Sequence, residues 1–171
     1  MADDVADDVA DGMADDVDGL RRAYLDAVVE IDLDGRRLEL TGAPRGTTRG
    51  RFPAGVGHVH VVTACNPRSE VLPAERNRMR NQALAAELAA AGLRSVPAVG
   101  RSPDGTWQEP SFAVLDADTP LLLDVADRHG QHAVYRWTPD ELAVVWAGRQ
   151  RGRVDAQGWV LRVIGGDERA R

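Results

Sequence analysis

The chain has 171 residues, of which 43% are hydrophobic, a size and composition that suit one globular domain. No apolar run approaches the roughly 18–20 residues that cross a bilayer, and the first residues do not form a secretory signal pattern. The single cysteine, Cys65, excludes an internal disulfide. We therefore expect a cytoplasmic protein without a membrane partner.

Charge is distributed unevenly along the chain. Residues 1–18 contain eight Asp and no basic residue, so leaving them out changes the net charge from -6 to +2. Repulsion among these charges predicts a disordered acidic tail over 1–18, followed by a single domain over 19–171. All 21 basic residues are Arg, which excludes a catalytic lysine. No basic patch with interleaved aromatic residues suggests a nucleic-acid partner.

Periodicity and turn residues predict the elements of this domain in chain order. Apolar residues at helical spacing predict a helix from Gly19 to Ile31, and Arg37 to Leu40 is a candidate edge strand. A loop rich in Gly, Pro and Arg follows over 41–57. The remaining elements are a strand over 58–65, a helix over 73–91, strands over 95–100 and 111–115, a helix over 119–129, and strands over 132–137, 142–146 and 159–164. Thr138–Glu141 is a capping-box pattern, so a helical turn is expected there.

Between residues 58 and 137 the order is strand, helix, strand, strand, helix, strand. This order is the split β-α-β arrangement of ferredoxin-like folds. We therefore predict an α+β fold with a ferredoxin-like βαββαβ core, an N-terminal helix and extra C-terminal strands.

This topology would gather polar residues at one end of the sheet. Asn77 and Asn81 continue the stripe of Leu84 and Leu88 along one helix, so both amides should point inward. Buried amides need hydrogen-bond partners. They either tie down nearby backbone or line a polar pocket.

The N-terminus of the same helix carries a partial positive charge, and arginines lie near it. These features favour a small anionic ligand, such as a metabolite or a nucleotide. The expected ligand-binding residues are Asn66, Asn77, Arg80, Asn81, Arg101, Ser102 and Gln131. Glu109 is the one candidate catalytic base, although an ion pair with Arg80 or Arg101 is the commoner outcome for such a carboxylate.

The histidine and cysteine side chains are weaker candidates for a metal site or a catalytic nucleophile. His58 and His60 share one face of a strand, but no third metal ligand is evident, so packing is the favoured interpretation. Cys65 would need His129 or His132 as a base to act as a nucleophile. No phosphate-binding loop or other cofactor motif occurs, so we expect neither a cofactor nor a metal.

Several motifs in residues 58–137 occur in combination. They are Thr63–Pro67, Glu75–Asn81 with Leu84 and Leu88, Gly100–Phe112, and Gly130–Gln131. This combination resembles the bacterial domain-of-unknown-function family 3293. Cys65 stands where that family commonly has an aromatic residue, which argues against an essential nucleophile. The resemblance implies a shared domain but no reaction.

Two hypotheses follow for the polar residues. In the first, they form a pocket for a small anionic metabolite or nucleotide. In the second, they are a structural hydrogen-bond network in a non-catalytic interaction or regulatory module. The sequence favours no particular oligomeric state.

Overall fold

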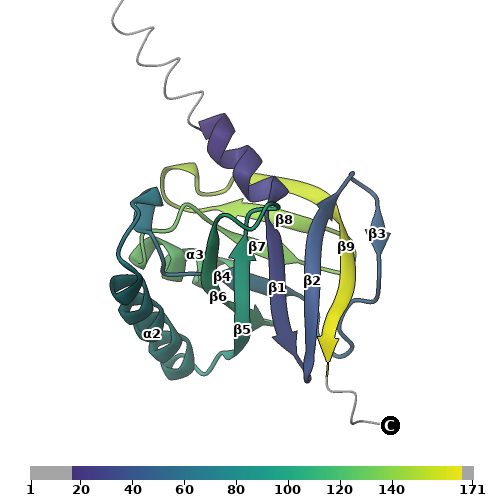
Figure 1. Cartoon of the computed structure of the whole chain (residues 1–171), viewed down its shortest axis with the longest axis horizontal. Helices are drawn as coiled ribbons and strands as arrows, with labels where there is room; N and C mark the ends of the chain where they lie inside the picture. Colours follow the sequence, from purple (N-terminus) through teal and green to yellow (C-terminus); the bar gives the residue numbers. More distant parts are fainter. Residues whose placement is uncertain (1–16, 167–171) are drawn as a thin grey trace, which may run out of the picture.

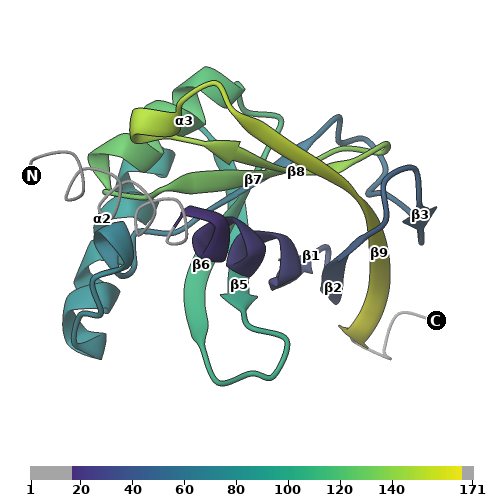
Figure 2. The ribbon, with the colours of Figure 1, turned by 90° about the horizontal axis from the view of Figure 1, so that it is seen from above.

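The computed structural model describes residues 17–166, and these form a closed eight-stranded antiparallel β-barrel with helices outside it (Figures 1 and 2). Around the barrel the order is β2-β1-β5-β6-β4-β7-β8-β9, and pairing of β9 with β2 closes the ring. The barrel strands are β1 (Val28–Leu33), β2 (Arg36–Ala43), β4 (Val59–Val62), β5 (Arg94–Arg101), β6 (Gln108–Leu115), β7 (Ala133–Trp137), β8 (Leu142–Trp146) and β9 (Val154–Gly166).

The remaining elements lie outside this ring. The short strand β3 (Thr48–Arg49) pairs with β9 in parallel. An N-terminal helix covers residues 17–26. The other helices are α2 (Ala74–Ala90), α3 (Thr119–Arg128) and the short 3₁₀ helices η1 (Pro67–Ser69) and η2 (Gly148–Gln150). Among the described residues, no helix has the length and apolar character needed to cross a membrane.

Two apolar surfaces hold the barrel together. Alternate residues such as Val29, Ile31 and Leu33 on β1 point inward and pack with Trp137 and Trp159, as the two-residue period of a strand requires. On the outside, α2 and α3 pack on β4, β6 and β7 in a second cluster. The barrel strands therefore bury apolar side chains on both faces where the helices cover them.

The prediction of a ferredoxin-like α+β fold was wrong. The four strands of the predicted unit are neighbours, in the order β5-β6-β4-β7, but they are only half of the barrel. β1 pairs with β5 and β8 pairs with β7, so neither edge of that unit is free. The long strand β9 then pairs with both β8 and β2. Closure of this kind depends on pairings distant in sequence, which local patterns do not reveal.

Several element boundaries also differ from the predictions. The predicted helix over 19–31 ends at residue 26, and β1 occupies the residues that follow. The predicted edge strand is β2, an interior member of the ring. Thr138–Glu141 is a hairpin turn closed by the Thr138 N–H donating to the Glu141 carbonyl at 2.9 Å. The first sixteen residues of the predicted tail lie outside the described residues, and Val17 and Asp18 belong to the N-terminal helix.

The N-terminal helix lies across one end of the barrel, which we call the barrel mouth (Figure 2). The Arg21 guanidinium donates to Asp155 on β9 at 2.8 Å. The Tyr135 hydroxyl donates to the Tyr24 carbonyl at 2.8 Å, and the Gln157 amide donates to the Leu25 carbonyl at 3.0 Å. These three contacts, which come from β7 and β9, fix the helix over the opening.

Candidate functional site

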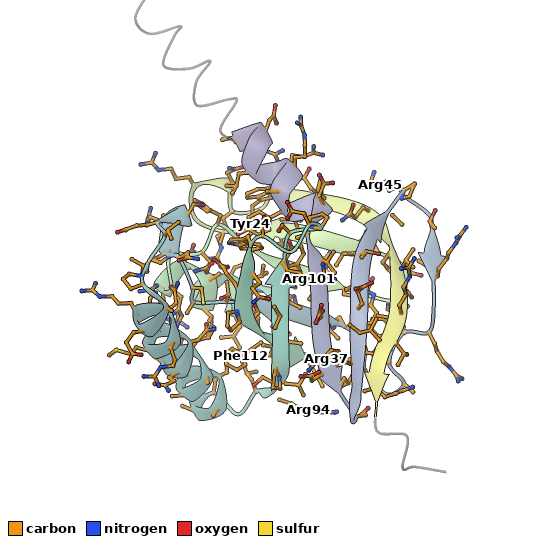
Figure 3. All side chains as sticks on the ribbon, viewed as in Figure 1. Tyr24, Arg37, Arg45, Arg94, Arg101 and Phe112 are labelled. Atoms are coloured by element: carbon orange, nitrogen blue, oxygen red, sulfur yellow. The ribbon has the colours of Figure 1, made fainter. Side chains whose placement is uncertain are left out.

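A pocket of about 530 Å³ lies at the barrel mouth beneath the N-terminal helix. Its walls come from that helix, the end of β4, the β5–β6 hairpin and the turn that joins α3 to β7. Tyr24 on the helix lines this pocket, and Figure 3 shows its position at the same end of the molecule as Arg101. Mouths of small barrels are common places for ligand sites.

Small inward-facing residues keep this pocket open. Gly100 on β5 pairs with Glu109 on β6, so no side chain stands directly opposite the Glu109 carboxylate. A Cβ added at Gly100 would meet one atom within 4 Å, the Ser111 hydroxyl oxygen at 3.9 Å. The space beside Glu109 therefore results from a glycine in an ordinary strand conformation.

The Glu109 carboxylate lies at the edge of this space. The residue is 8% exposed, and its Oε1 accepts a hydrogen bond from Asn66 Nδ2 at 2.6 Å. Within residues 17–166 this is the one hydrogen bond made to the carboxylate. Burial raises the pKa of Glu109, and the Asn66 hydrogen bond opposes the rise. Neither Arg80 nor Arg101 forms the ion pair with Glu109 that the sequence suggested as an alternative.

Asn66 is held in place by its neighbours. Its backbone adopts the left-handed conformation with φ of 44°, which Asn tolerates better than most residues. Its Oδ1 accepts from the Leu72 N–H at 3.0 Å and from Asn77 Nδ2 at 2.8 Å. Asn77 Oδ1 in turn accepts from the Asn66 N–H at 2.9 Å. Asn77 therefore orients the side chain that contacts Glu109.

Arg80 and Asn81 contact backbone behind the pocket wall. Arg80 donates to the Ala64 carbonyl and to the His129 carbonyl, both at 2.7 Å. Asn81 Oδ1 accepts from the Ala64 N–H at 2.9 Å, and Asn81 Nδ2 donates to the Pro110 carbonyl at 2.7 Å. These contacts join the end of β4 to β6 and to the end of α3. Of the two alternatives for the inward-facing amides, the contacts of Asn81 and Asn77 therefore match the one in which the amides tie down nearby backbone.

The other predicted site residues divide between the pocket and the outside of the barrel. Gln131 lines the pocket and donates from Nε2 to the Cys65 carbonyl at 2.9 Å. Ser102 also lines it, and its hydroxyl donates to Asp104 at 2.6 Å. Arg101 instead points away from the barrel interior and pairs with Glu30 and Glu39, each at 2.8 Å.

The structure thus brings four of the eight predicted residues to the pocket. These are Asn66, Ser102, Glu109 and Gln131. Asn77, Arg80 and Asn81 lie behind its wall, and Arg101 lies apart. A binding role for these residues stays a prediction.

Sequence reasoning missed two aromatic residues of the pocket, Tyr24 and Tyr135. Their rings lie 5.7 Å apart, and the Tyr24 ring is 5.5 Å from that of Trp146. Tyr24 belongs to the apolar face of the predicted N-terminal helix. The spacing of that face predicts that it is buried, but does not show that it covers the end of a barrel. The alternation of Ala133, Tyr135 and Trp137 was the available signal for one inward-facing row.

His58, just before β4, and His60, within it, are engaged in packing. His58 Nε2 lies 2.8 Å from the Ala117 carbonyl, and His60 Nε2 lies 2.9 Å from the Thr119 hydroxyl. Burial, with smaller contributions from His58 and Arg136, lowers the pKa of His60 to about 4. Within the described part of the chain, no three His, Cys, Asp or Glu side chains gather as metal ligands would.

Cys65 has an environment that disfavours its thiolate. The residue is buried, and its burial raises the pKa of the thiol. The His129 ring, which was a candidate base, instead contacts Glu87 at 2.8 Å. Nothing in this geometry supports the nucleophile alternative.

A family model described as "Protein of unknown function (DUF3293)" matches residues 62–134. This range runs from the end of β4 into β7 and contains Asn66, Glu109 and Gln131. No curated protein and no solved structure matches the chain. The N-terminal helix, β1, β2, β8 and β9 lie outside the matched range. Over residues 62–134, this chain therefore resembles the family of proteins of unknown function DUF3293.

Proposed function

We propose that the pocket at the barrel mouth binds a small, partly apolar organic molecule, with the Glu109 carboxylate as its main hydrogen-bond acceptor. One observation carries the proposal. Glu109 is 8% exposed at the edge of an open space of about 530 Å³, and one hydrogen bond is made to its carboxylate within the described residues.

A buried carboxylate with a single donor is costly to maintain. An ionised carboxylate has four lone-pair sites, and its removal from water costs several kcal/mol when they are not used. The fold could avoid this cost with a neutral residue at position 109. A ligand that donates to Glu109 would offset the cost in the bound state, which supports a binding role for this side chain.

The side chains around the pocket also bear on the charge of the ligand. The lining includes the carboxylates of Glu109 and Asp26 and, among the described residues, no arginine. Arg80 contacts backbone carbonyls, and Arg101 pairs with two carboxylates elsewhere. An anion, which the sequence favoured, would meet repulsion here. A neutral or cationic molecule suits the pocket better.

The alternative of an interaction module with a structural polar cluster accounts for part of the network. Asn77, Arg80 and Asn81 act on neighbouring backbone or on Asn66, as a structural network would. It does not account for Glu109 or for the open space beside Gly100. Glu109 as a general base stays a prediction: its raised pKa suits proton transfer, but no hydrogen bond joins it to a second titratable side chain in residues 17–166.

Filling the pocket tests the proposal directly. Gly100→Leu would place a side chain beside Glu109 without backbone strain, and Gly100→Val is a smaller version. Val99→Leu on the outward face of the same strand is the matched control, since Val99 does not line the pocket. The probe is the neutral dye N-phenyl-1-naphthylamine, whose fluorescence rises in apolar sites.

We expect saturable fluorescence with the wild-type protein and with Val99→Leu, and its loss in both Gly100 variants. Circular dichroism and thermal unfolding establish that each variant is folded. Equal fluorescence from all folded variants, or none from the wild-type protein, would overturn the proposal.

A further inference from the structure

We infer that the ligand of this pocket is a small organic cation with an ammonium group, which binds with its N–H groups directed at Glu109. This inference rests on the proposed function and adds the chemical class of the ligand. Three independent observations lead to it: the charge of the lining, the direction of most of its hydroxyl groups, and its aromatic side chains.

The first observation is charge. Glu109 stands inside the pocket and Asp26 at its exposed rim, and the described lining holds no arginine to compensate them. Because Glu109 is buried, its charge is weakly screened by water, and a cation next to it would be strongly favoured. A carboxylate at the rim would also attract a cation toward the opening.

The second observation concerns hydrogen-bond donors. Four of the six residues with hydroxyl groups that line the pocket direct their protons away from the open space. Thr63 donates to the Pro110 carbonyl at 2.8 Å, and Ser111 donates to the Glu109 carbonyl at 3.1 Å. Tyr135 donates to the Tyr24 carbonyl.

The Ser102 hydroxyl and the Gln131 amide also direct their protons away from the open space. Ser102 donates its proton to Asp104. Gln131 uses its Nε2 on the Cys65 carbonyl, which leaves its Oε1 as an acceptor. These five side chains therefore present acceptors, and not donors, to the pocket. A primary ammonium, with three donors and no acceptor, complements such a wall.

The third observation is the aromatic content of the walls. Tyr24, Tyr135 and Trp107 all line the pocket, and ring faces attract cations within about 6 Å. Trp107 is 44% exposed at the tip of the β5–β6 hairpin, so its ring is available to the apolar part of a ligand. Charge, acceptors and aromatic rings together favour an ammonium joined to a short apolar or aromatic body.

A series of three probes with one framework separates this inference from the proposed function. The probes are 2-phenylethylammonium, neutral 2-phenylethanol and anionic phenylacetate, with binding measured by titration calorimetry and by NMR shifts of pocket residues. The variant is Glu109→Gln, which keeps an acceptor for Asn66 and removes the charge. Asp140→Asn is the matched control, because Asp140 lies on an exposed turn outside the pocket.

We expect the ammonium to bind most tightly and the carboxylate least. Glu109→Gln should weaken ammonium binding by roughly 10- to 100-fold, the range for loss of a charged hydrogen bond. It should change binding of the alcohol little, and Asp140→Asn should change neither. The NMR shifts should include Tyr24 and Gly100.

The possible failures are distinguishable. If the alcohol binds in the pocket as tightly as the ammonium, or if Glu109→Gln leaves the preference unchanged, the inferred ligand class is wrong and the proposed function stands. If none of the three probes shifts any pocket residue at millimolar concentration, and the neutral dye also fails to bind, both are wrong.

Discussion

Asn66 and Glu109 are joined by a 2.6 Å hydrogen bond from the Asn66 amide to the Glu109 carboxylate, across 43 positions of sequence. The bond links the turn after β4 to the inner face of β6. Asn77 orients Asn66 from α2, so helix, turn and strand together set the position of one buried charge. The barrel mouth thus holds a carboxylate that is fixed in direction and only partly satisfied.

This partly satisfied charge should destabilise the unliganded protein at neutral pH. Burial raises the pKa of Glu109 above its ordinary value of 4.5, so the native state takes up a proton at higher pH than the unfolded state does. The contribution of Glu109 to stability therefore falls as pH rises through its native pKa. Glu109→Gln should raise the free energy of unfolding at pH 7, and the gain should shrink as pH falls toward 4.5.

Chemical denaturation of both proteins at a series of pH values measures this difference. The other titratable side chains facing the pocket are Tyr24, Tyr135, His132 and Asp26, and both proteins share them, so their effects largely cancel in the comparison. A variant less stable than wild type at pH 7, or a gain that does not change with pH, would contradict the assigned burial of charge.

Asn66 should contribute to the stability of the protein through its backbone conformation as well as through its side chain. Asn66→Gly removes the hydrogen bonds to Leu72, Asn77 and Glu109 but keeps the left-handed conformation accessible. Asn66→Ala removes the same bonds and adds strain at φ of 44°, which costs about 1–2 kcal/mol. Both variants should be less stable than wild type, and the Ala variant should be the less stable of the two by about 1 kcal/mol. Equal stability would show that the backbone conformation relaxes.

Local patterns predicted many elements of this fold but not how they assemble. α2 and α3 were found from Pro, Gly and apolar spacing, and β4 to β8 from β-branched and apolar runs. The closure of the barrel depends on β9 pairing with β2, segments more than a hundred residues apart. The helix predicted through Ile31 also concealed β1, because Val28 and Ile31 fit helical spacing and a strand equally well. Without β1, the strand predicted at Arg37 to Leu40 had no neighbour that joined it to β5, and a ring could not be inferred.

The candidate site could be predicted in part, for a similar reason. Asn66, Glu109 and Gln131 belong to turns and strand ends that meet under either topology. Arg101 was expected at the same place. Because successive side chains of a strand point to opposite faces, Arg101 lies on the outer face of β5, where it pairs with Glu30 and Glu39. Its neighbour Gly100 occupies the inward-facing position, so the pocket lining contains a glycine there and not the positive charge of Arg101. Tyr24 enters the site only because the N-terminal helix covers the barrel mouth.

Asn81 should be a major determinant of stability. It is 8% exposed and bridges the Ala64 N–H and the Pro110 carbonyl. Asn81→Ala leaves the Ala64 N–H without this acceptor, while Pro110 keeps the Thr63 hydroxyl as a donor. We expect a loss of about 1–3 kcal/mol in the free energy of unfolding. Gln82→Ala, at an exposed position of the same helix, should change stability by less than about 0.5 kcal/mol. Similar effects from both variants would contradict the bridging role.

His60 should make the protein sensitive to acid. Its native pKa of about 4 lies below the ordinary value of 6.5, chiefly because the ring is buried; His58 and Arg136 add repulsion. The unfolded state therefore takes up a proton first as pH falls, and stability declines between about 6.5 and 4. At about 1.4 kcal/mol for each unit of pKa, the loss should be on the order of 3 kcal/mol.

NMR titration should give a midpoint near 4 for His60. In His60→Gln, which keeps His58 and Arg136, the decline over this range should be smaller by that amount. A midpoint near 6.5, or an unchanged decline of stability in the variant, would contradict this prediction. Either result would mean that water reaches the His60 ring and that the 2.9 Å contact between His60 and Thr119 is not maintained.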